Sequence, residues 1–388
     1  MKLVVDTLPP EQAWDVVASA LSGADPVLIA PGGSGVSAPD SSSSDAGLLN
    51  GAAIAMATSG STGLPKWVVL EGDALRASAE ATLEHLGGPG QWLQPLRLAH
   101  IAGWQVWTRS VLAGIPPVLL PAGSGHFSIA AFAEASTQMN LAQRRYTALV
   151  PTQVHRLLSD PVGIAALQSF HTVLIGGAAL PPAMKAQLDA HGISTITTYG
   201  MTETGGGCLY NGTPLPGYAV RTTDDGRLQL SGPSLARGYL GDDELTTASF
   251  SQDQGRRWFT TGDLGQQRDG VWQVLGRADD VINTGAKKVL PARVEASLQQ
   301  VSHIEQACAL GIADPEWGQR LVAAVVLDDP AAAPANATDW IRGVLRDSLD
   351  AHEIPRDILV LDQLPLLPGG KVDKATLRRL LTDSSGTI

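Results

Sequence analysis

The sequence predicts an α/β fold: a large N-terminal domain of parallel-type sheets and helices with a small β subdomain, then a small α+β C-terminal domain. Strand-like apolar runs alternate with helical segments between residues 52 and 200, which is typical of parallel sheets covered by helices. Short strands at 227–232 and 271–276 follow with turns between them. A further series of helices and strands comes after residue 276.

Local patterns predict the individual elements. Helical spacing of apolar residues predicts helices at 11–22 and 101–114. A third helix is predicted at 73–87, with Asp73 as its N-cap and Gly87 as its terminator. Strands are predicted for the apolar runs at 25–30, 52–58, 67–72, 172–178 and 194–200, and a loop for the Gly/Ser/Pro-rich stretch 31–47. The predicted domains are 1–276 and 277–388, with a hinge near Asp279.

Composition excludes several classes of protein. The chain has 388 residues, of which 44% are apolar and 17% charged, as in folded proteins of two or three domains. A net charge of −11 disfavours a nucleic-acid partner. The two cysteines, Cys208 and Cys308, are too far apart for a zinc motif and too few for a disulfide framework. The sequence contains no apolar run long enough for a membrane span and no signal-peptide pattern, which together favour the cytoplasm.

The strongest local signal is the segment Thr58-Ser59-Gly60-Ser61-Thr62-Gly63-Leu64-Pro65-Lys66, between two predicted strands. Glycines let backbone N–H groups turn toward an anion, while hydroxyls and a lysine add donors. The segment is not a Walker A loop, because Gly63 and Lys66 are not adjacent. It therefore predicts a phosphate-binding loop of another type, with an ordinary polar turn as the alternative.

A second signal is the segment TYGMTET at 198–204, which ends a predicted strand. The ring of Tyr199 can stack on a purine, and the Glu203 carboxylate beside the Thr202 hydroxyl can hold Mg²⁺ against phosphate oxygens. A buried tyrosine at an ordinary strand end is the alternative interpretation.

Two further segments carry charge on tight turns. Asp263 follows Gly262 and can accept hydrogen bonds from ribose hydroxyls, while Arg277 can donate to ribose or phosphate. Lys371 lies on the glycine-containing segment 368–374 and can reach a distant anion as a mobile charge. Solvated turns would explain either segment alone.

Taken together and in this order, these segments resemble the adenylate-forming superfamily of acyl-CoA synthetases, adenylation domains and luciferases. The resemblance rests on SGSTGLPK, YGMTET, TGD, GRADDVINTGAKKV and PGGKVDK, and it extends from about residue 52 to 382. Lesser matches are VLIGGAALP at 173–181, GTPLPGYAV at 212–220 and RLQLSGPSLARGYL at 227–240. The phosphate loop comes earlier in this sequence than in most of the family, which implies that part of the usual first sheet is absent or rebuilt.

The resemblance implies an ATP site. It assigns the triphosphate to Thr58, Ser59, Gly60, Ser61, Thr62, Gly63 and Lys66, the adenine to Gly177, Ala178 and Tyr199, and the ribose to Asp263 and Arg277. It assigns the α-phosphate to Thr202 and Mg²⁺ to Glu203, and it makes Lys371 the residue that stabilises attack of a carboxylate on the α-phosphorus. The C-terminal domain would then rotate about Asp279, and the loop 282–288 would line a tunnel for the thiol of CoA.

The acid substrate is predicted less directly. His100 lies in a segment that resembles the family's gate to the acyl pocket, with a histidine packed under Trp104 as the alternative. No aspartate stands in 99–108 to pair with a substrate amine, which disfavours amino acids. The short chain resembles the o-succinylbenzoate–CoA ligases of menaquinone biosynthesis. The second carboxylate of that acid would need donors, for which the candidates are His100, Gln105, Arg109 and Thr152.

Several alternatives stay open at this point. They are another aryl- or fatty-acyl-CoA ligase, a stand-alone adenylation domain that loads a carrier protein, and a nucleotide-binding regulator without turnover. Retention of Glu203, Asp263 and Lys371 disfavours the regulator. The expected partners are small molecules, namely a carboxylic acid, ATP and CoA. The oligomeric state is left open, with a homodimer as one alternative.

Overall fold

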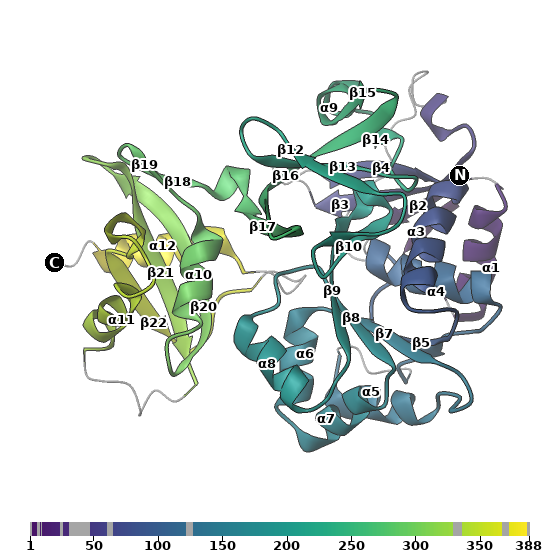
Figure 1. The fold of residues 1–388 in the computed structure, drawn as a ribbon, viewed down its shortest axis with the longest axis horizontal. Coiled ribbons are helices and arrows are strands. Elements are labelled where there is room, and N and C mark those ends of the chain that lie inside the picture. The colour runs from purple at the N-terminus through teal and green to yellow at the C-terminus, as the bar shows by residue number, and fades with distance from the viewer. Residues whose placement is uncertain are drawn as a thin grey trace. The chain divides into compact units, whose positions relative to one another are not determined.

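A computed structural model describes residues 2–5, 8, 10–23, 26–30, 47–59, 65–121, 127–328, 336–366 and 372–385. The chain divides into two compact units (Figure 1). The first comprises Met1–Thr223, Gln229–Thr261 and Gln267–Trp272, and the second comprises Asp224–Leu228, Gly262–Gln266 and Gln273–Ile388. Among the described residues, none of the helices is both long and apolar enough to cross a bilayer.

The first sheet of the first unit has the strand order β1-β2-β3-β4-β14. Its strands are β1 (Lys2–Val5), β2 (Val27–Ala30), β3 (Ala52–Ser59), β4 (Pro65–Glu71) and β14 (Gly238–Leu240). Strands β1, β2 and β3 are parallel, whereas β4 runs antiparallel to both β3 and β14. The prediction of parallel-type sheets therefore holds for one side of this sheet, and a hairpin completes the other side.

The second sheet has the order β11-β10-β9-β8-β7-β5-β6. Its strands are β5 (Gln91–Gln94), β6 (Val118–Leu119), β7 (Arg145–Leu149), β8 (Thr172–Ile175), β9 (Thr195–Met201), β10 (Gly206–Tyr210) and β11 (Thr213–Pro214). Strands β5 to β9 pair in parallel, and β10 and β11 add an antiparallel edge.

Helices fill the space between these sheets and cover the far side of the second (Figure 1). Helices α1 (Pro10–Leu21), α3 (Gly72–His85) and α4 (Ile101–Ala113) pack on the first sheet through one core that includes Ile54, Leu70, Leu75 and Trp104. The opposite sides of α3 and α4 contribute Ala81 and Val106 to a core with the second sheet. The other face of that sheet is covered by α5 (Ile129–Thr137), α6 (Pro151–Leu158), α7 (Pro161–Gln168) and α8 (Pro182–Ala190).

A smaller β-sheet follows in the chain, with the order β12-β13-β16-β15 and β17 paired to β16. Its strands are β12 (Ala219–Thr222), β13 (Arg227–Ser231), β15 (Phe250–Asp253), β16 (Arg256–Arg268) and β17 (Val271–Arg277), with α9 (Asp243–Ser249) before β15. This sheet is the predicted small β subdomain.

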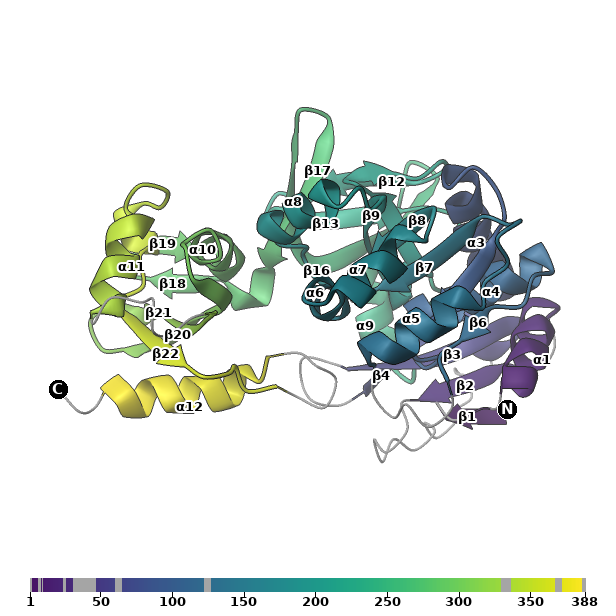
Figure 2. The same ribbon diagram turned by 90° about the horizontal axis from the view of Figure 1, so that it is seen from below.

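The second unit is built on a sheet of order β19-β18-β21-β20 in which β22 pairs with β21. The strands are β18 (Ile282–Thr284), β19 (Lys287–Val289), β20 (Ile304–Asp314), β21 (Gly318–Leu327) and β22 (Asp357–Leu361). Helices α10 (Pro291–Leu298) and α11 (Ala337–Leu345) cover one face, and α12 (Lys374–Ser385) covers the other (Figure 2). This sheet with helices on both faces confirms the predicted α+β character of the C-terminal part.

Three local expectations need correction. Asp73 is not the N-cap of α3, because the helix begins one residue earlier with Glu71 as N-cap, and Asp73 instead forms an ion pair with Arg76. Helix α7 was not anticipated, since its mostly apolar sequence lacks a polar face. The segment 282–288 is a short hairpin of β18 and β19 rather than a loop. The predicted loop at 31–47 lies almost wholly outside the described residues.

Gly200 shows why the edge of the second sheet requires glycine. A Cβ at this position would lie 2.1 Å from the carbonyl oxygen of Gly206 on β10. We expect Gly200→Ala to lower the free energy of unfolding by about 1–3 kcal/mol, because β9 and β10 would have to separate. Urea unfolding measures the change. The matched control is Gly47→Ala, whose new methyl group meets nothing within 4 Å. Equal stability of both variants would contradict the prediction.

Candidate active site

The β3–β4 hairpin presents the predicted phosphate loop. Thr58 and Lys66 are cross-strand partners at its end, and the Thr58 hydroxyl donates to the Lys66 carbonyl oxygen over 3.2 Å. The alanine-rich strand β3 is buried from Ala52 to Ala57, and the chain leaves the core only at Thr58. Of the predicted loop residues, Gly60, Ser61, Thr62 and Gly63 lie outside the described residues, as does the side chain of Ser59.

The predicted adenine residues lie on neighbouring strands of the second sheet. Gly177 and Ala178 lie just beyond the end of β8, after Gly176, and Tyr199 lies on β9, which pairs with β8 in parallel. Gly177 has φ of +82°, a conformation that favours glycine, and it turns the chain at the carboxyl end of β8. Clefts at the carboxyl ends of parallel strands are common ligand sites in α/β proteins.

The turn η1 (Thr202–Thr204) carries the two predicted catalytic residues that follow Tyr199. Three hydrogen bonds from distant segments hold it. Ala236 N–H donates to the Glu203 carbonyl oxygen over 2.8 Å, and the Ser234 hydroxyl donates to the Thr204 carbonyl oxygen over 2.6 Å. The Gln105 amide of α4 donates to the Gly205 carbonyl oxygen over 2.6 Å. The backbone around Glu203 is therefore fixed before any ligand binds.

The Glu203 carboxylate is held by a residue that the sequence analysis did not single out. The Tyr239 hydroxyl of β14 donates to Glu203 Oε1 over 2.9 Å. Burial, followed by the negative charge of Glu203, raises the pKa of Tyr239 above its usual range, so the phenol stays protonated and remains a donor. Lys66 Nζ lies 5.8 Å from the centre of the same ring. Tyr239 thus links the hairpin lysine to the predicted magnesium ligand. Its sequence signal was its place in the matched segment 227–240.

Three predicted residues lie together in the second unit. Arg277 Nη1 is 3.4 Å from a carboxylate oxygen of Asp263, and Arg277 Nη2 is 3.6 Å from one of Asp279. Gly262 makes this approach possible, because a Cβ there would lie 2.6 Å from Arg277 Nη2. The structure thereby brings the predicted ribose residues into contact with the predicted hinge residue. Lys371 lies outside the described residues.

Helix α4 carries the residues predicted to contact the acid. His100 is exposed at its N-cap position, while Trp104 is fully buried one turn later. Gln105 and Arg109 point into the protein, and both are buried. Thr152, the remaining candidate, is exposed at the start of α6.

Arg109 is a buried cation in an uncharged setting. Its Nε donates to the Gln105 carbonyl oxygen over 2.8 Å, and its guanidinium lies 4.0 Å from the centre of the Trp92 ring. No carboxylate among the described residues forms an ion pair with it. Burial lowers the pKa of Arg109 to about 10, which still leaves it charged at neutral pH. A buried charge without an opposite charge is costly, and it favours an anionic ligand nearby.

Neither cysteine supplies a reactive thiolate. Cys208 on β10 donates weakly from Sγ to the Tyr199 carbonyl oxygen over 3.6 Å. Burial raises the pKa of Cys208 and of Cys308 to about 12. Both are free thiols that remain protonated at neutral pH.

The residues around Glu203 suit a magnesium ion that arrives with a nucleotide. Proteins commonly bind Mg²⁺ through one or two carboxylates together with substrate phosphates. Within the described part of the chain, no group of three or more His, Cys, Asp or Glu could hold a metal ion by itself. The single Glu203 carboxylate, held by Tyr239, therefore fits a Mg²⁺ ion that is bound jointly by the protein and by the phosphates of a nucleotide.

Comparison with known proteins places this geometry in a family. The family model for AMP-binding enzymes matches residues 2–240, and the model for the AMP-binding enzyme C-terminal domain matches residues 293–371. The chain belongs to the AMP-binding enzymes, and the predicted membership of the adenylate-forming superfamily is confirmed.

Several individual proteins are similar to this chain over most of its length. The chain is 39% identical over 369 residues to a protein of Mycobacterium tuberculosis named probable 2-succinylbenzoate–CoA ligase, with 92% of each chain covered. It is 31% identical over 353 residues to the 2-succinylbenzoate–CoA ligase of Listeria monocytogenes, covering 85% of this chain and 70% of the relative. In fold it resembles o-succinylbenzoate CoA synthetase from Bacillus subtilis in complex with its acyl-adenylate intermediate, with a TM-score of 0.73, 23% identity and coverage of 97% and 82%.

The hydrogen bond from Tyr239 to Glu203 has a measurable consequence. We expect Tyr239→Phe to raise the Mg²⁺ concentration required for half-maximal pyrophosphate release about tenfold, because the carboxylate loses the donor that orients it. A magnesium titration at saturating ATP and acid measures this. The control is Tyr146→Phe, which removes hydrogen bonds to the carbonyl oxygens of Leu86 and Gly88 and should leave the requirement unchanged. An unchanged requirement in Tyr239→Phe would contradict the assigned role.

Proposed function

We propose that this protein is an ATP-dependent acid–thiol ligase that converts 2-succinylbenzoate (o-succinylbenzoate) into its CoA thioester through an acyl-adenylate. The observation that carries the proposal is 39% identity to the mycobacterial relative over 92% of both chains. The named Listeria relative and the neighbouring Bacillus structure support the same acid. The sequence motifs resemble those of the o-succinylbenzoate–CoA ligases of menaquinone biosynthesis, so we propose that the product is a precursor in that pathway.

The chemistry of the first half-reaction explains the residues proposed for it. Both reactants, a carboxylate and a triphosphate, are anions, so the protein must neutralise charge and align them. Lys66 and the hydroxyls of Thr58, Ser59, Ser61 and Thr62 would bind the phosphates, with Gly60 and Gly63 shaping the loop. Thr202 would contact the α-phosphate, where the acid attacks, and Lys371 would stabilise the charge that develops there.

Glu203 would hold Mg²⁺, which supplies positive charge to the phosphate oxygens when it is bound. Gly177, Ala178 and Tyr199 would surround the adenine, with the ring of Tyr199 available for stacking. Asp263 would accept the ribose hydroxyls, with Arg277 beside it. The ion pair between these two supports the assignment, because Arg277 orients the Asp263 carboxylate.

The second half-reaction transfers the acyl group to the thiol of CoA and releases AMP. We propose a hinge at Asp279 between domains 1–276 and 277–388. Its position in the short turn η2 (Ala278–Asp280), between β17 and β18, supports this role, since few residues there would need to change conformation. The contact of Arg277 with Asp279 would have to break or change during rotation.

Arg109 is the best candidate for the second carboxylate of the acid. Of the four predicted donors, His100 and Thr152 are exposed, and the amide nitrogen of Gln105 is already bonded to the Gly205 carbonyl oxygen. Arg109 alone combines a permanent charge with burial and lacks an ion-pair partner among the described residues. His100, at the start of the same helix, would act at the entrance of the acyl pocket.

The cysteines bear on the cellular compartment of the protein. Two free, buried cysteines support a reducing compartment and thus the cytoplasm. A homodimer is compatible with the proposal, and sedimentation at several protein concentrations distinguishes it from a monomer.

The first test is a substrate panel. Pyrophosphate release is measured with 2-succinylbenzoate, benzoate, a medium-chain fatty acid and mixed amino acids, each with and without CoA. We expect release only with 2-succinylbenzoate, together with the CoA thioester. Turnover of another acid would show that the protein is a CoA ligase with a different acid substrate. Transfer to a carrier protein in place of CoA would identify an adenylation domain, and no release with any acid would refute the proposal.

If Arg109 binds the second carboxylate of the acid, its substitution should weaken binding of the acid but not of ATP. Arg109→Met keeps much of the side-chain volume and removes the charge. We expect it to raise the KM for 2-succinylbenzoate about 10- to 100-fold, since a charge-assisted hydrogen bond is lost, and to leave the KM for ATP unchanged. Alanine variants of His100, Gln105 and Thr152 complete the set. An unchanged KM for the diacid in all four variants would show that its second carboxylate binds elsewhere.

A further inference from the structure

An ion pair between Lys374 and Asp280 joins the first residue of α12 to the turn η2. Lys374 Nζ lies 2.6 Å from Asp280 Oδ2, and the two side chains are 36% and 33% exposed. The residues are 94 positions apart in the chain, and both belong to the second unit. The pair is therefore a long-range link that the mechanism proposed above does not use.

Lys374 faces a second acidic side chain besides Asp280. Its charge acts on Glu295 of α10, whose carboxylate accepts from the Ala309 N–H of β20 over 2.9 Å. Burial raises the pKa of Glu295, and the charge of Lys374 is a lesser, opposing cause. Removal of Lys374 would leave the repulsion between Glu295 and Asp280 without a compensating charge, so the lysine is needed to keep these elements together.

The residues directly before α12 are fixed by further hydrogen bonds. Asp373 caps the helix, since its carboxylate accepts from two backbone N–H groups of the first turn. Its own N–H donates to the Pro365 carbonyl oxygen over 2.8 Å, next to an antiparallel bridge between Leu366 and Val372. Lys371 directly precedes Val372 in the sequence, so the chain on its C-terminal side starts from a fixed position.

The length of the chain limits where Lys371 can lie. Three residues of extended chain span at most about 11 Å, so Lys371 stays within that distance of the anchored Lys374 backbone. Asp280 directly follows Asp279, the proposed hinge, on the side that leads into the rest of the C-terminal domain. A rotation about Asp279 would therefore carry the ion pair along unbroken.

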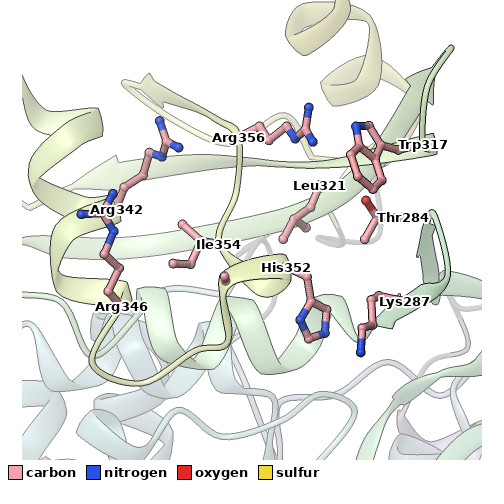
Figure 3. A pocket seen from close by; sticks show the side chains of 10 residues that line it. Thr284, Lys287, Trp317, Leu321, Arg342, Arg346, His352, Ile354 and Arg356 are labelled. Carbon is pink, nitrogen blue, oxygen red and sulfur yellow. The ribbon is translucent and has the colours of Figure 1, made fainter.

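Neither residue of the pair lines the larger cavity of the second unit. That cavity has a volume of about 430 Å³, and its described lining includes Lys287, Trp317 and Arg342 (Figure 3). Lys374 and Asp280 line a much smaller hollow next to β20 instead. Substitutions of the pair therefore leave the wall of the larger cavity unchanged.

We propose that Lys374 is a positioning residue for formation of the acyl-adenylate. Its ion pair with Asp280 fixes the segment that carries Lys371 to the turn beside the hinge, so that domain rotation brings the charge of Lys371 to the α-phosphorus. This proposal rests on the proposed function and adds to it a residue that acts through Lys371. Such anchoring matters because a displacement of about 1 Å in a reacting group can slow a reaction about 100-fold.

The test separates the two half-reactions in the full-length enzyme. The first is followed as single-turnover pyrophosphate release, and the second as thioester formation from synthetic 2-succinylbenzoyl-adenylate and CoA. For Lys374→Gln we expect the rate of pyrophosphate release at saturating substrates to fall about 10- to 100-fold. The concentrations of ATP and acid that give half the maximal rate should stay unchanged. The second half-reaction should keep its native rate, because Lys371 acts only in the first.

Further variants distinguish the ion pair from general packing. Asp280→Asn should reproduce the defect, and Lys374→Gln/Asp280→Asn should be no slower than either single variant, because all three remove the same interaction. Lys374→Arg should recover most of the rate, since it retains the charge. The matched control is Arg320→Gln, which breaks an ion pair with Asp357 of similar exposure in the same unit and should release pyrophosphate at the native rate.

Hydrogen exchange tests the anchor without any activity. The Asp373 amide, which is bonded to Pro365, should exchange about tenfold faster in Lys374→Gln and at the native rate in Arg320→Gln. A native rate of pyrophosphate release in Lys374→Gln, an equal loss in both half-reactions or unchanged exchange at Asp373 would overturn the proposal. Failure of the native enzyme to release pyrophosphate with any acid would refute the ligase function instead, while exchange at Asp373 would still decide whether the ion pair fixes the segment.

Discussion

The short turn Thr202–Thr204 is the constraint on which the rest of the first unit depends. It follows β9 of the second sheet, and its backbone is bonded to α4 through Gln105 and to the segment 234–236 that leads into the first sheet. The Glu203 side chain is bonded to the first sheet directly through Tyr239. Two sheets and the helix between them therefore fix one carboxylate, so its orientation costs little conformational entropy when a ligand arrives.

Sequence patterns predicted the site to the extent that its residues are contiguous. Thr58 and Lys66 share one short segment, and Glu203 lies in another, and the residue types in each segment indicate its chemistry. Asp263 and Arg277 come from two such segments, and the structure brings them into contact. The sequence did not indicate Tyr239, because its function depends on a contact across 36 residues, from β14 of the first sheet to the turn that follows β9 of the second sheet. Local sequence carries no signal for such a contact, and only the matched segment around Tyr239 pointed to it.

The secondary structure likewise divides into elements that local sequence predicts and elements that depend on tertiary contacts. Strands and helices with clear periodicity, such as α4 and β9, follow directly from the sequence. Asp73 illustrates the limit, since an aspartate near a helix start suits both the N-cap and the first turn, and the ion pair with Arg76 is formed in the first turn. Helix α7 shows a second limit of prediction from sequence. Its apolar residues pack against α5 and α6 and do not form the periodic apolar stripe by which a helix is predicted.

The buried cysteines have a consequence for an enzyme that makes an activated acyl group. An acyl-adenylate reacts with a thiolate within reach, and a reactive cysteine near Tyr199, the residue proposed to contact adenine, would become acylated in place of CoA. Cys208 lies next to Tyr199, yet burial raises its pKa to about 12. Its sulfur therefore stays a protonated, weakly nucleophilic thiol. Burial of Cys208 thus lowers its reactivity toward an acyl-adenylate formed by the enzyme.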